Sequence, residues 1–407
     1  MTATAFLWGA ATAGHQVEGN NVNADIWLLE QVPGTSFLVP SGDACDSLHR
    51  WREDVGLVRS LGLNCYRFSV EWSRIEPTPG YFSTAWLDHY ARIAAACREA
   101  GIAPVVTLSH FTSPRWFAQA GGWTQADAPM LFARYAERVT RRLAPWASHV
   151  VTFNEPNLPL MGRWSATPIA DPGREGLDRM LAAATRACGS DRFDVWVYSR
   201  GEEAALANLL AGHRAARSAV KAVRADLPVG MSLALPDVQA VGTQSGVAAY
   251  RRHAEAPFFA AARDDDFLGV QTYGRLRLDA QAVVPPPADA ERTQSGDEYY
   301  PWALAAAVTR AHAETGRPVL VTENGIATAD DRQRARYIAD ALASLDTART
   351  AGVPVIGYIH WSLLDNFEWR RGYAQRFGLV AVDRRTFRRT AKPSARRYAE
   401  LVRARQA

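Results

Sequence analysis

The sequence predicts a (β/α)8 barrel, and two features of its pattern carry that prediction. Eight short apolar runs recur along the 407 residues, with segments of helical spacing between them. The runs are continuously apolar and do not alternate, as is typical of parallel strands covered on both faces. Eight such units in one chain of this size are typical of a closed barrel. A doubly wound sheet is the alternative, but no G-x-G-x-x-G follows the first run.

The first half of the chain contains four of the predicted strands. We expect them at residues 6–10, 64–70, 103–109 and 149–154. Helices are expected where apolar residues recur at helical spacing, at residues 48–61, 87–100 and 129–143. Gly62 and Gly101 directly follow two of these helices and are typical stop signals. A strand follows soon after each helix, as a parallel barrel requires.

The second half repeats the order and completes the barrel. Its strands are expected at residues 229–234, 267–273, 319–323 and 353–361. Its helices are expected at residues 202–224, 302–315, 332–351 and 394–405. Two stretches rich in Gly, Pro and polar residues are predicted to be loops, residues 161–176 and the segment from Pro285 to 298. No repeat or change of composition marks a boundary, so residues 1–407 are predicted to form one domain.

Composition excludes several classes of protein. A net charge of +4 is small for this length and gives no reason to expect a nucleic-acid or anionic-membrane partner. The four cysteines lack metal-binding spacing, so we expect reduced thiols and no metal or cofactor. Residues 1–13 lack the basic region of a signal peptide, and no run of about 18 apolar residues could span a membrane. A cytoplasmic protein is expected.

Two of the predicted strands end on a glutamate. One runs from Val151 to Glu155 and is stopped by Pro156, which has no N–H for a sheet ladder. The other delivers Glu323 just before Asn-Gly. A carboxyl at the end of a buried strand is costly unless it faces a cleft that uses it. As strands four and seven of a ring of eight, these ends should face each other across the mouth of the barrel.

Two carboxyls that face each other over a pocket fit the cleavage of a glycosidic bond. The aromatic rings of Trp361 and Trp369 offer flat apolar faces for a sugar, and Glu368 can accept hydrogen bonds from two hydroxyls. A metal site would need a cluster of ligands, a serine hydrolase a G-x-S-x-G turn, and a phosphate site a glycine-rich loop. The sequence has neither of these last two motifs, and His110 is the main histidine at a strand end.

Six segments in order resemble one known family. They are HQVEG from His15, YRFSVEWSRIEP from Tyr66, TFNEP from Thr152, DFLGVQTY from Asp266, TENG from Thr322, and WSLLDNFEWRRGY from Trp361 continuing into RFGLVAVD. On these segments the chain resembles glycoside hydrolase family 1, the β-glucosidase family. The resemblance extends from Phe6 to Tyr398, nearly the whole length.

The resemblance implies a retaining β-glycosidase that acts on small β-glycosides. Glu155 would be the acid/base and Glu323 the nucleophile, with the two carboxyls about 5–5.5 Å apart. Arg67 and Tyr273 would lie beside Glu323, and Asn154 would hold the sugar 2-hydroxyl. The residues implied to bind the outer hydroxyls and the ring of the terminal sugar are Gln16, His110, Trp361, Glu368, Trp369 and Phe377. β-Glucosides are the first candidate substrates, followed by β-galactosides and β-fucosides.

Charge should divide the roles of the two glutamates. We expect Arg67 to lower the pKa of Glu323, and the negative charge of Glu323 to raise the pKa of Glu155. Four positions depart from the family pattern: His15, the Phe111-Thr-Ser-Pro run, Asn157 and Gln271. Phe111 and Asn157 were expected to reshape the wall beside the leaving group, and Gln271 to act on the pKa of Glu155.

Three rival functions stay open at this point. A phospho-glycosidase would need small or basic residues in place of Glu368 and Trp369. A transglycosidase would use the same glutamates with an acceptor other than water. A sugar-binding pseudoenzyme would be expected to have lost one glutamate. The sequence leaves the natural aglycone and the oligomeric state open.

Overall fold

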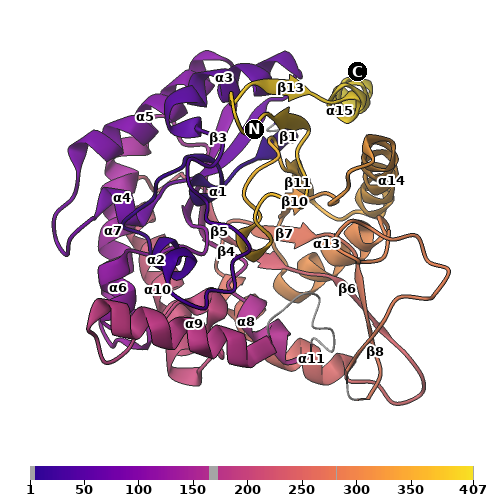
Figure 1. Cartoon of the computed structure of the whole chain (residues 1–407). Coiled ribbons are helices and arrows are strands. Elements are labelled where there is room, and N and C mark those ends of the chain that lie inside the picture. The colour runs from indigo at the N-terminus through magenta and orange to yellow at the C-terminus, as the bar shows by residue number, and fades with distance from the viewer. Residues whose placement is uncertain (1–4, 165–172, 281, 407) are drawn as a thin grey trace.

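The computed structural model describes residues 5–164, 173–280 and 282–406, and these residues form a closed barrel of eight parallel strands (Figure 1). The order around the ring is β1-β11-β10-β7-β5-β4-β3-β2, so each barrel strand lies beside its neighbours in the chain. The barrel strands are β1 (Leu7–Ala11), β2 (Cys65–Ser69), β3 (Ala103–Ser109), β4 (His149–Asn154), β5 (Val229–Ala234), β7 (Leu268–Thr272), β10 (Val319–Asn324) and β11 (Val355–Trp361). The predicted fold class is confirmed, and every predicted strand lies within two residues of its observed bounds.

Helices surround the barrel, as Figure 1 shows for α3, α5, α7, α10, α13 and α14. The longer helices are α3 (Ser47–Ser60), α5 (Thr84–Glu99), α7 (Ala128–Leu143), α9 (Gly173–Cys188), α10 (Glu203–Val223), α13 (Ala303–Thr315), α14 (Asp331–Thr350) and α15 (Pro393–Gln406). Helix α5 begins three residues before its predicted start at Leu87, because the side chain of Ser83 accepts a hydrogen bond from Trp86 N and caps the helix.

The shorter helices lie mostly in the connections between strands and helices. They are α1 (Gly14–Val17), α2 (Asp25–Gln31), α4 (Trp72–Ile75), α6 (Arg115–Gln119), α8 (Leu158–Met161), α11 (Val247–Ala254) and α12 (Ala256–Ala262). The loop predicted at residues 161–176 is partly wrong. Helix α9 begins at Gly173, and Gly162–Trp164 is a 3-10 turn. Residues 165–172 lie outside the described part of the chain.

Two small sheets were not predicted from the sequence. Strands β6 (Asp237–Ala240), β8 (Arg275–Leu278) and β9 (Val283–Val284) form a three-stranded sheet outside the barrel. Strands β12 (Val380–Val382) and β13 (Arg389–Ala391) form an antiparallel pair. Each of these strands has two to four residues, too short for a periodic pattern to be recognised.

The inside of the barrel is filled by side chains. Cys65, Val105, Val151, Leu320 and Ile359 come from five different strands and form one buried cluster. A larger apolar core lies between the barrel and the helices, and its fully buried rings include Trp72, Phe132, Tyr135 and Tyr398. The packed barrel leaves the ends of its strands as the place for a site.

The strands that carry the two glutamates are irregular near those residues. The pairing of β4 with β5 shifts register between Val151 and Asn154, and the pairing of β10 with β7 shifts between Val321 and Glu323. Such irregularities bend a strand and change the direction of the following side chains. They therefore help to aim Glu155 and Glu323 at the mouth of the barrel.

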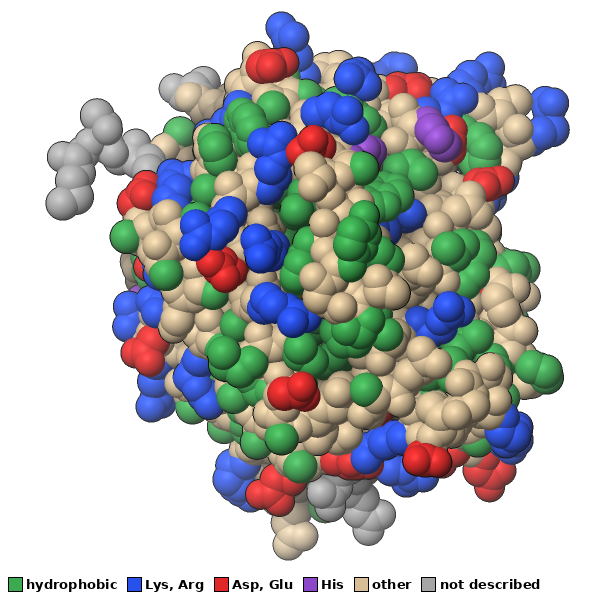
Figure 2. All heavy atoms as spheres, turned by 90° about the vertical axis from the view of Figure 1, so that its left-hand side faces the viewer, with side chains coloured by type: hydrophobic (Ala, Val, Ile, Leu, Met, Phe, Trp, Pro, Cys, Tyr) green, Lys and Arg blue, Asp and Glu red, His purple; other side chains and the backbone are tan. Residues whose placement is uncertain are grey.

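The surface carries charges of both signs. Figure 2 shows basic and acidic side chains mixed over one face, with small apolar areas between them. Among residues 5–164, 173–280 and 282–406, no helix combines the length and the apolar character that crossing a bilayer requires. All four cysteines are free thiols, and Cys45, Cys65 and Cys97 are buried.

Candidate active site

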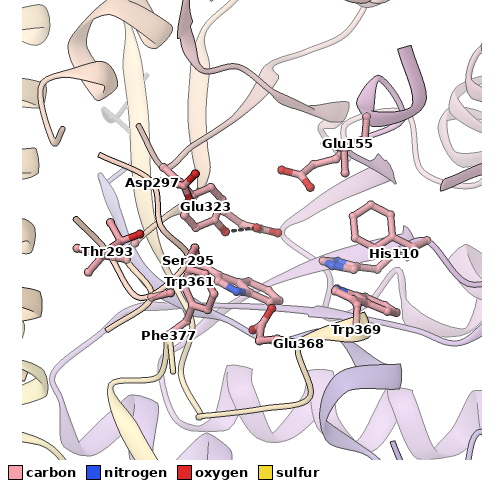
Figure 3. Close-up of a pocket in the computed structure, with 16 residues that line it drawn as sticks. His110, Glu155, Thr293, Ser295, Asp297, Glu323, Trp361, Glu368, Trp369 and Phe377 are labelled. Atoms are coloured by element: carbon pink, nitrogen blue, oxygen red, sulfur yellow. Dashed lines mark hydrogen bonds between the residues drawn. The ribbon is translucent and has the colours of Figure 1, made fainter. Parts of the chain in front are cut away.

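A cavity of about 310 Å3 opens at the C-terminal ends of the barrel strands (Figure 3). Both glutamates of the predicted pair line it, Glu155 from the end of β4 and Glu323 from β10. The other lining residues are His110, Phe111, Leu158, Tyr273, Thr293, Ser295, Asp297, Gly325, Ile326, Ala327, Trp361, Glu368, Trp369 and Phe377. The structure thus brings together residues that are up to 267 positions apart in the chain, from His110 to Phe377.

Glu155 occupies an unusual backbone conformation directly after β4. Its φ is 47°, in the left-handed region that non-glycine residues rarely adopt, and its N–H continues the barrel ladder by donating to Ser232 O at 2.8 Å. Strain of this kind is often found where a side chain is held for function. Phe111 and Trp369, which also line the cavity, have positive φ as well.

The carboxyl of Glu155 lies in a setting that favours its protonated form. Burial raises its pKa well above the usual range, and the negative charge of Glu323 raises it further, while Arg67 opposes both effects. Within the described chain, no side chain donates a hydrogen bond to this carboxyl. The expected rise in the pKa of Glu155 is therefore confirmed.

Glu323 is held by two strong donors. Arg67 Nη1 donates to its Oε1 at 2.6 Å, and Tyr273 Oη donates to its Oε2 at 2.6 Å. The phenol is a reliable donor because burial and the nearby Glu323 charge raise the pKa of Tyr273 well above its usual value. Both contacts leave the carboxylate fixed in one orientation, facing the cavity (Figure 3).

The prediction that the pKa of Glu323 is lowered was wrong. Burial raises the pKa of this carboxyl above its usual value, and this effect exceeds the lowering by Arg67 and by the hydrogen bonds from Tyr273, Arg67 and Gln271. Only 3% of Glu323 is exposed, so the cost of removing its charge from water is large. The order of the two groups is nevertheless as expected, since Glu155 is raised further.

Arg67 connects the nucleophile candidate to Asn154. Its Nη2 donates to Asn154 Oδ1 at 2.5 Å, and its Nε donates to Thr107 Oγ1 at 3.0 Å. Gln271 Nε2 also donates to Asn154 Oδ1, at 2.7 Å. The Asn154 oxygen is thus occupied twice, which turns its amide nitrogen toward His110 Nε2, 3.3 Å away. Gln271 therefore acts on Asn154 and Glu323, and the expectation that it tunes Glu155 was wrong.

Four rings form a nearly parallel series along one wall. His15 stacks on Trp369 with an interplanar angle of 1°, Trp369 on His110 with 12°, and His110 on Trp361 with 15°. Burial, followed by the charge of Arg67, lowers the pKa of His110 well below its usual value, so its imidazole is neutral. The rings of His110, Trp361 and Trp369 offer the cavity a flat wall with hydrogen-bonding edges.

Glu368 is the third carboxyl of the cavity. Burial raises its pKa well above the usual range, the charge of Glu323 adds to the rise, and a hydrogen bond from Trp361 opposes it. Its Oε1 is buried and has no hydrogen-bond partner among the described residues. A buried carboxyl oxygen without a partner is costly, so this atom is available for a ligand.

Three predicted site residues are not in the wall of the cavity itself. Arg67 and Asn154 lie directly behind Glu323 and His110, through the contacts given above. Gln16 is fully buried, and its Nε2 donates at 2.8 Å to the backbone oxygen of Phe367, next to Glu368. Its Oε1 has no hydrogen-bond partner in the part of the chain that the structure describes. Direct sugar contact by Gln16 and Asn154 stays a prediction.

One departure from the family pattern, Asn157, has a different place from the expected one. Asn157 is fully buried, with its Nδ2 donating to Ala234 O at 2.8 Å and its Oδ1 accepting from Ala234 N at 3.0 Å. It ties the end of β4 to β5, so its expected place on the leaving-group wall was wrong. His15 lies behind Trp369 and contacts Glu30 Oε1 through Nε2 at 2.7 Å.

Several residues of the cavity were missed by sequence reasoning. Thr293, Ser295 and Asp297 come from the segment predicted to be a plain loop, and Leu158, Ile326 and Ala327 follow the two strand ends. Nothing in the spacing of the polar loop residues indicates a site.

The fold and the site together define a class of protein. A (β/α)8 barrel with two glutamates of unequal pKa that face one cavity walled by aromatic rings is the arrangement of an O-glycosyl hydrolase. The sequence profile of "Glycosyl hydrolase family 1" matches residues 2–221 and 270–407. The chain belongs to this family.

Named relatives agree with the assignment. A β-glucosidase of Agrobacterium sp. (strain ATCC 21400) is 31% identical over 455 aligned residues, which cover 98% of this chain and 94% of the relative. The crystal structure of β-glycosidase BGL167 is 47% identical, with a TM-score of 0.93 and coverage of 98% of this chain and 96% of that one. The apo structure of β-glucosidase 1317 is 42% identical, with a TM-score of 0.94 and 98% coverage of both chains.

Proposed function

We propose that this protein removes the terminal sugar from β-D-glycosides by double displacement with retention of configuration. The observation that carries the proposal is the unequal treatment of the two glutamates. Glu323 has two fixed donors and is oriented as an anion, whereas Glu155 has none and the larger rise in pKa. One group is thereby suited to attack and the other to give a proton.

In the first step, a carboxylate oxygen of Glu323 attacks the anomeric carbon as the bond from this carbon to the aglycone oxygen breaks. The proton of Glu155 goes to that oxygen, so the aglycone leaves as a neutral alcohol or sugar. The sugar remains bonded to Glu323 as an ester. Tyr273 and Arg67 keep the nucleophile in place throughout.

In the second step, water releases the sugar. Esterification removes the negative charge of Glu323, so one cause of the high pKa of Glu155 disappears. Glu155, now a carboxylate, takes a proton from water while the water oxygen bonds to the anomeric carbon. The ester breaks, Glu323 regains its charge, and Glu155 regains its proton. Two inversions give overall retention.

The terminal sugar is placed between the ring wall and Glu368. Its outer hydroxyls hydrogen-bond to Glu368, His110 and Gln16, and its 2-hydroxyl hydrogen-bonds to Asn154. The residues that contact its ring are Trp361, Trp369 and Phe377. Support comes from the unpartnered buried oxygens Oε1 of Glu368 and Oε1 of Gln16, which need donors such as sugar hydroxyls. We propose β-glucosides first, and β-galactosides and β-fucosides as further substrates.

The experiment is an assay of purified protein with aryl β-glucoside, β-galactoside and β-fucoside, followed by proton NMR of the first sugar released. The β-anomer should appear first with each substrate that is cleaved. Appearance of the α-anomer first would contradict double displacement. If the protein bound sugar but cleaved none of the three substrates, it would be a sugar-binding protein and the enzyme proposal would be wrong.

A transglycosidase is the second candidate, because its chemistry uses the same two glutamates. The same assay with an added alcohol distinguishes the two functions. A hydrolase releases mainly free sugar, whereas a transglycosidase gives mainly the alkyl glycoside at alcohol concentrations far below that of water. A phospho-glycosidase is disfavoured because the cavity offers a phosphate the acid Glu368 where such an enzyme needs a small or basic residue.

We also propose that residues 1–407 work as one catalytic domain in the cytoplasm. All the residues given roles above come from one barrel and the loops that follow its strands. The four free cysteines suit a reducing compartment. Fractionation of the producing cells, with the aryl glycoside assay on each fraction, tests the location.

A further inference from the structure

The hairpin that contains Thr293, Ser295 and Asp297 forms one rim of the cavity and has no role in the mechanism above. Asp297 lies on the side of Glu323 away from Glu368, as Figure 3 shows. Glu155, the proposed proton donor to the leaving oxygen, is also on that side (Figure 3). The hairpin therefore borders the space into which the aglycone must leave.

The rim is fixed by backbone contacts. Thr293 N donates to Asp297 O at 2.8 Å, and Arg292 and Glu298 form an antiparallel bridge. Gln294 N donates to the backbone oxygen of Ala327, itself a lining residue, at 2.8 Å. A rim held in this way presents its polar groups in defined positions, which lowers the entropic cost of binding.

The side chain of Gln294 holds the hairpin from the opposite side. Its Nε2 donates to the backbone oxygen of Ala374 at 2.8 Å, and its Oε1 accepts from Arg376 N at 3.2 Å. Gln294 and Ser295 form the turn at the tip of the hairpin, where Gly296 N donates to Thr293 O at 3.0 Å. With Gln294 held in this way, Thr293 and Ser295 are among the lining residues of the cavity.

Two polar side chains of the rim make no hydrogen bond within the described chain, although the charges of Arg371 and Arg292 act on Asp297. Thr293 Oγ1 is buried and has no hydrogen-bond partner. No hydrogen bond from residues 5–164, 173–280 or 282–406 reaches the carboxylate of Asp297, which is exposed at the mouth. A carboxylate has two oxygens that accept hydrogen bonds and suits the neighbouring hydroxyls of a sugar.

Apolar side chains line the cavity together with this rim. Leu158 follows the loop after Glu155, and Ile326 and Ala327 follow β10. A sugar ring has one apolar face and a polar edge, so it can contact both the apolar lining residues and the polar rim. An alkyl or aryl aglycone would use the apolar wall and leave Asp297 and Thr293 without partners.

We propose that Asp297, supported by Thr293, determines specificity for the aglycone and selects a second sugar that donates hydroxyls to it. This inference rests on the proposed function, since it concerns the leaving group of the same reaction. The favoured substrates are then β-linked disaccharides and short oligosaccharides. Asp297 binds the leaving part and takes no part in the chemistry of the anomeric carbon.

The test compares cellobiose and gentiobiose with 4-nitrophenyl β-glucoside, which has the same terminal sugar and a flat apolar aglycone. We expect Asp297→Ala to lower kcat/KM for at least one disaccharide by about tenfold to 100-fold, the effect of losing charge-assisted hydrogen bonds. For the aryl glucoside, kcat/KM should stay within about twofold of wild type. Asp297→Asn should fall between wild type and Asp297→Ala.

Matched variants separate this effect from a change in folding. Asp289→Ala removes an exposed acid from the same loop outside the cavity and should leave both rates unchanged. Thr293→Val keeps the shape of the side chain without its hydroxyl and should weaken disaccharides only. Thermal unfolding of all variants provides the check on structure.

The outcomes separate this inference from the proposed function. If Asp297→Ala leaves the ratio of disaccharide to aryl rates unchanged, or wild type cleaves the aryl glucoside and no disaccharide, the aglycone inference is wrong while the glycosidase proposal stands. If wild type cleaves none of these compounds, both fail.

Discussion

The guanidinium of Arg67 donates to the carboxylate of Glu323 at 2.6 Å, and the two side chains are only 1% and 4% exposed. A buried ion pair of this kind does not by itself stabilise a fold, because both charges have been removed from water. Its value here is positional, since the same guanidinium also holds Asn154. One residue therefore sets the geometry of two others in the site.

Replacing Arg67 with Met should destabilise the protein by about 3–5 kcal/mol, because Glu323 is left as an unpaired buried charge. The loss of stability should grow as pH rises. Without Arg67 the pKa of Glu323 in the folded protein is raised further above its value in the unfolded chain. The unfolded chain therefore loses this proton at lower pH, which favours unfolding as pH rises. Urea unfolding below and above neutrality measures this. In the double variant with Glu323→Gln, the dependence on pH should be smaller, and an equal dependence would place its cause elsewhere.

The pH profile of kcat/KM should be bell-shaped, with both limbs at higher pH than a free glutamate would give. Activity should fall on the acidic side as Glu323 becomes protonated, and on the alkaline side as Glu155 loses its proton. Both pKa values are raised by burial, and that of Glu155 is raised more. The apparent pKa values of the two limbs belong to the pair of glutamates, because the two groups titrate together. An alkaline limb that persists unchanged in Glu155→Gln would rule out Glu155 as its source.

Glu155→Gln should slow substrates with poor leaving groups most. An alkyl or sugar aglycone needs the proton of Glu155 to depart, whereas an activated aryl group such as 2,4-dinitrophenol departs without it. A series of aryl glucosides of graded leaving-group pKa measures the effect. If Glu155→Gln slowed every aryl glucoside of the series equally, Glu155 would not be the general acid. Glu155→Asp, which keeps the acid and shortens the side chain, serves as the comparison.

Glu323→Ala should be nearly inactive and recover with azide. The cavity left by the carboxylate admits a small anion, which attacks the anomeric carbon once and gives an inverted α-glycosyl azide. NMR of the product and single-turnover rates with an activated aryl glucoside measure this. A β-configured azide product would mean that a second nucleophile exists in the chain, and the assignment of Glu323 would be wrong.

Tyr273→Phe should lower kcat/KM by about tenfold or more, because a hydrogen bond to a charged group contributes about 1.5–3 kcal/mol. The ring itself packs against Phe377 and should remain in place, so stability should change little. Steady-state kinetics and thermal unfolding together test this. A large loss of stability with normal kinetics would show that the phenol serves the fold and not the nucleophile.

The barrel and the glutamate pair follow from local features of the sequence. Continuous apolar runs between helical segments mark buried parallel strands, and Pro156 and the Asn324-Gly325 pair mark where two of them stop. Strand ends of a closed barrel meet at one mouth, so Glu155 and Glu323 could be placed opposite each other before any coordinates. For the same reason Trp361, which ends the last barrel strand, and Glu368, which follows it, were placed in the site.

Other features depend on the packed structure alone. Asn157 turned out to tie β4 to β5, and Gln271 to hold Asn154, because their partners are backbone and side chains from other strands. The direction of the Glu323 pKa shift depends on how completely the site is closed to water, a quantity that no spacing of residues records. The very short strands β6, β8 and β9 likewise depend on tertiary contacts.

The sequence by itself determined the architecture, the two glutamates and the aromatic wall, because each is encoded by a local pattern of apolar runs, stop signals and neighbouring residues. Only the tertiary structure decided which polar loop borders the leaving group. Thr293, Ser295 and Asp297 face the cavity because Gln294 fastens their hairpin to Ala327 and Ala374, residues distant in the chain. Such a contact forms only when distant parts of the chain pack together, and the spacing of the loop residues does not predict it.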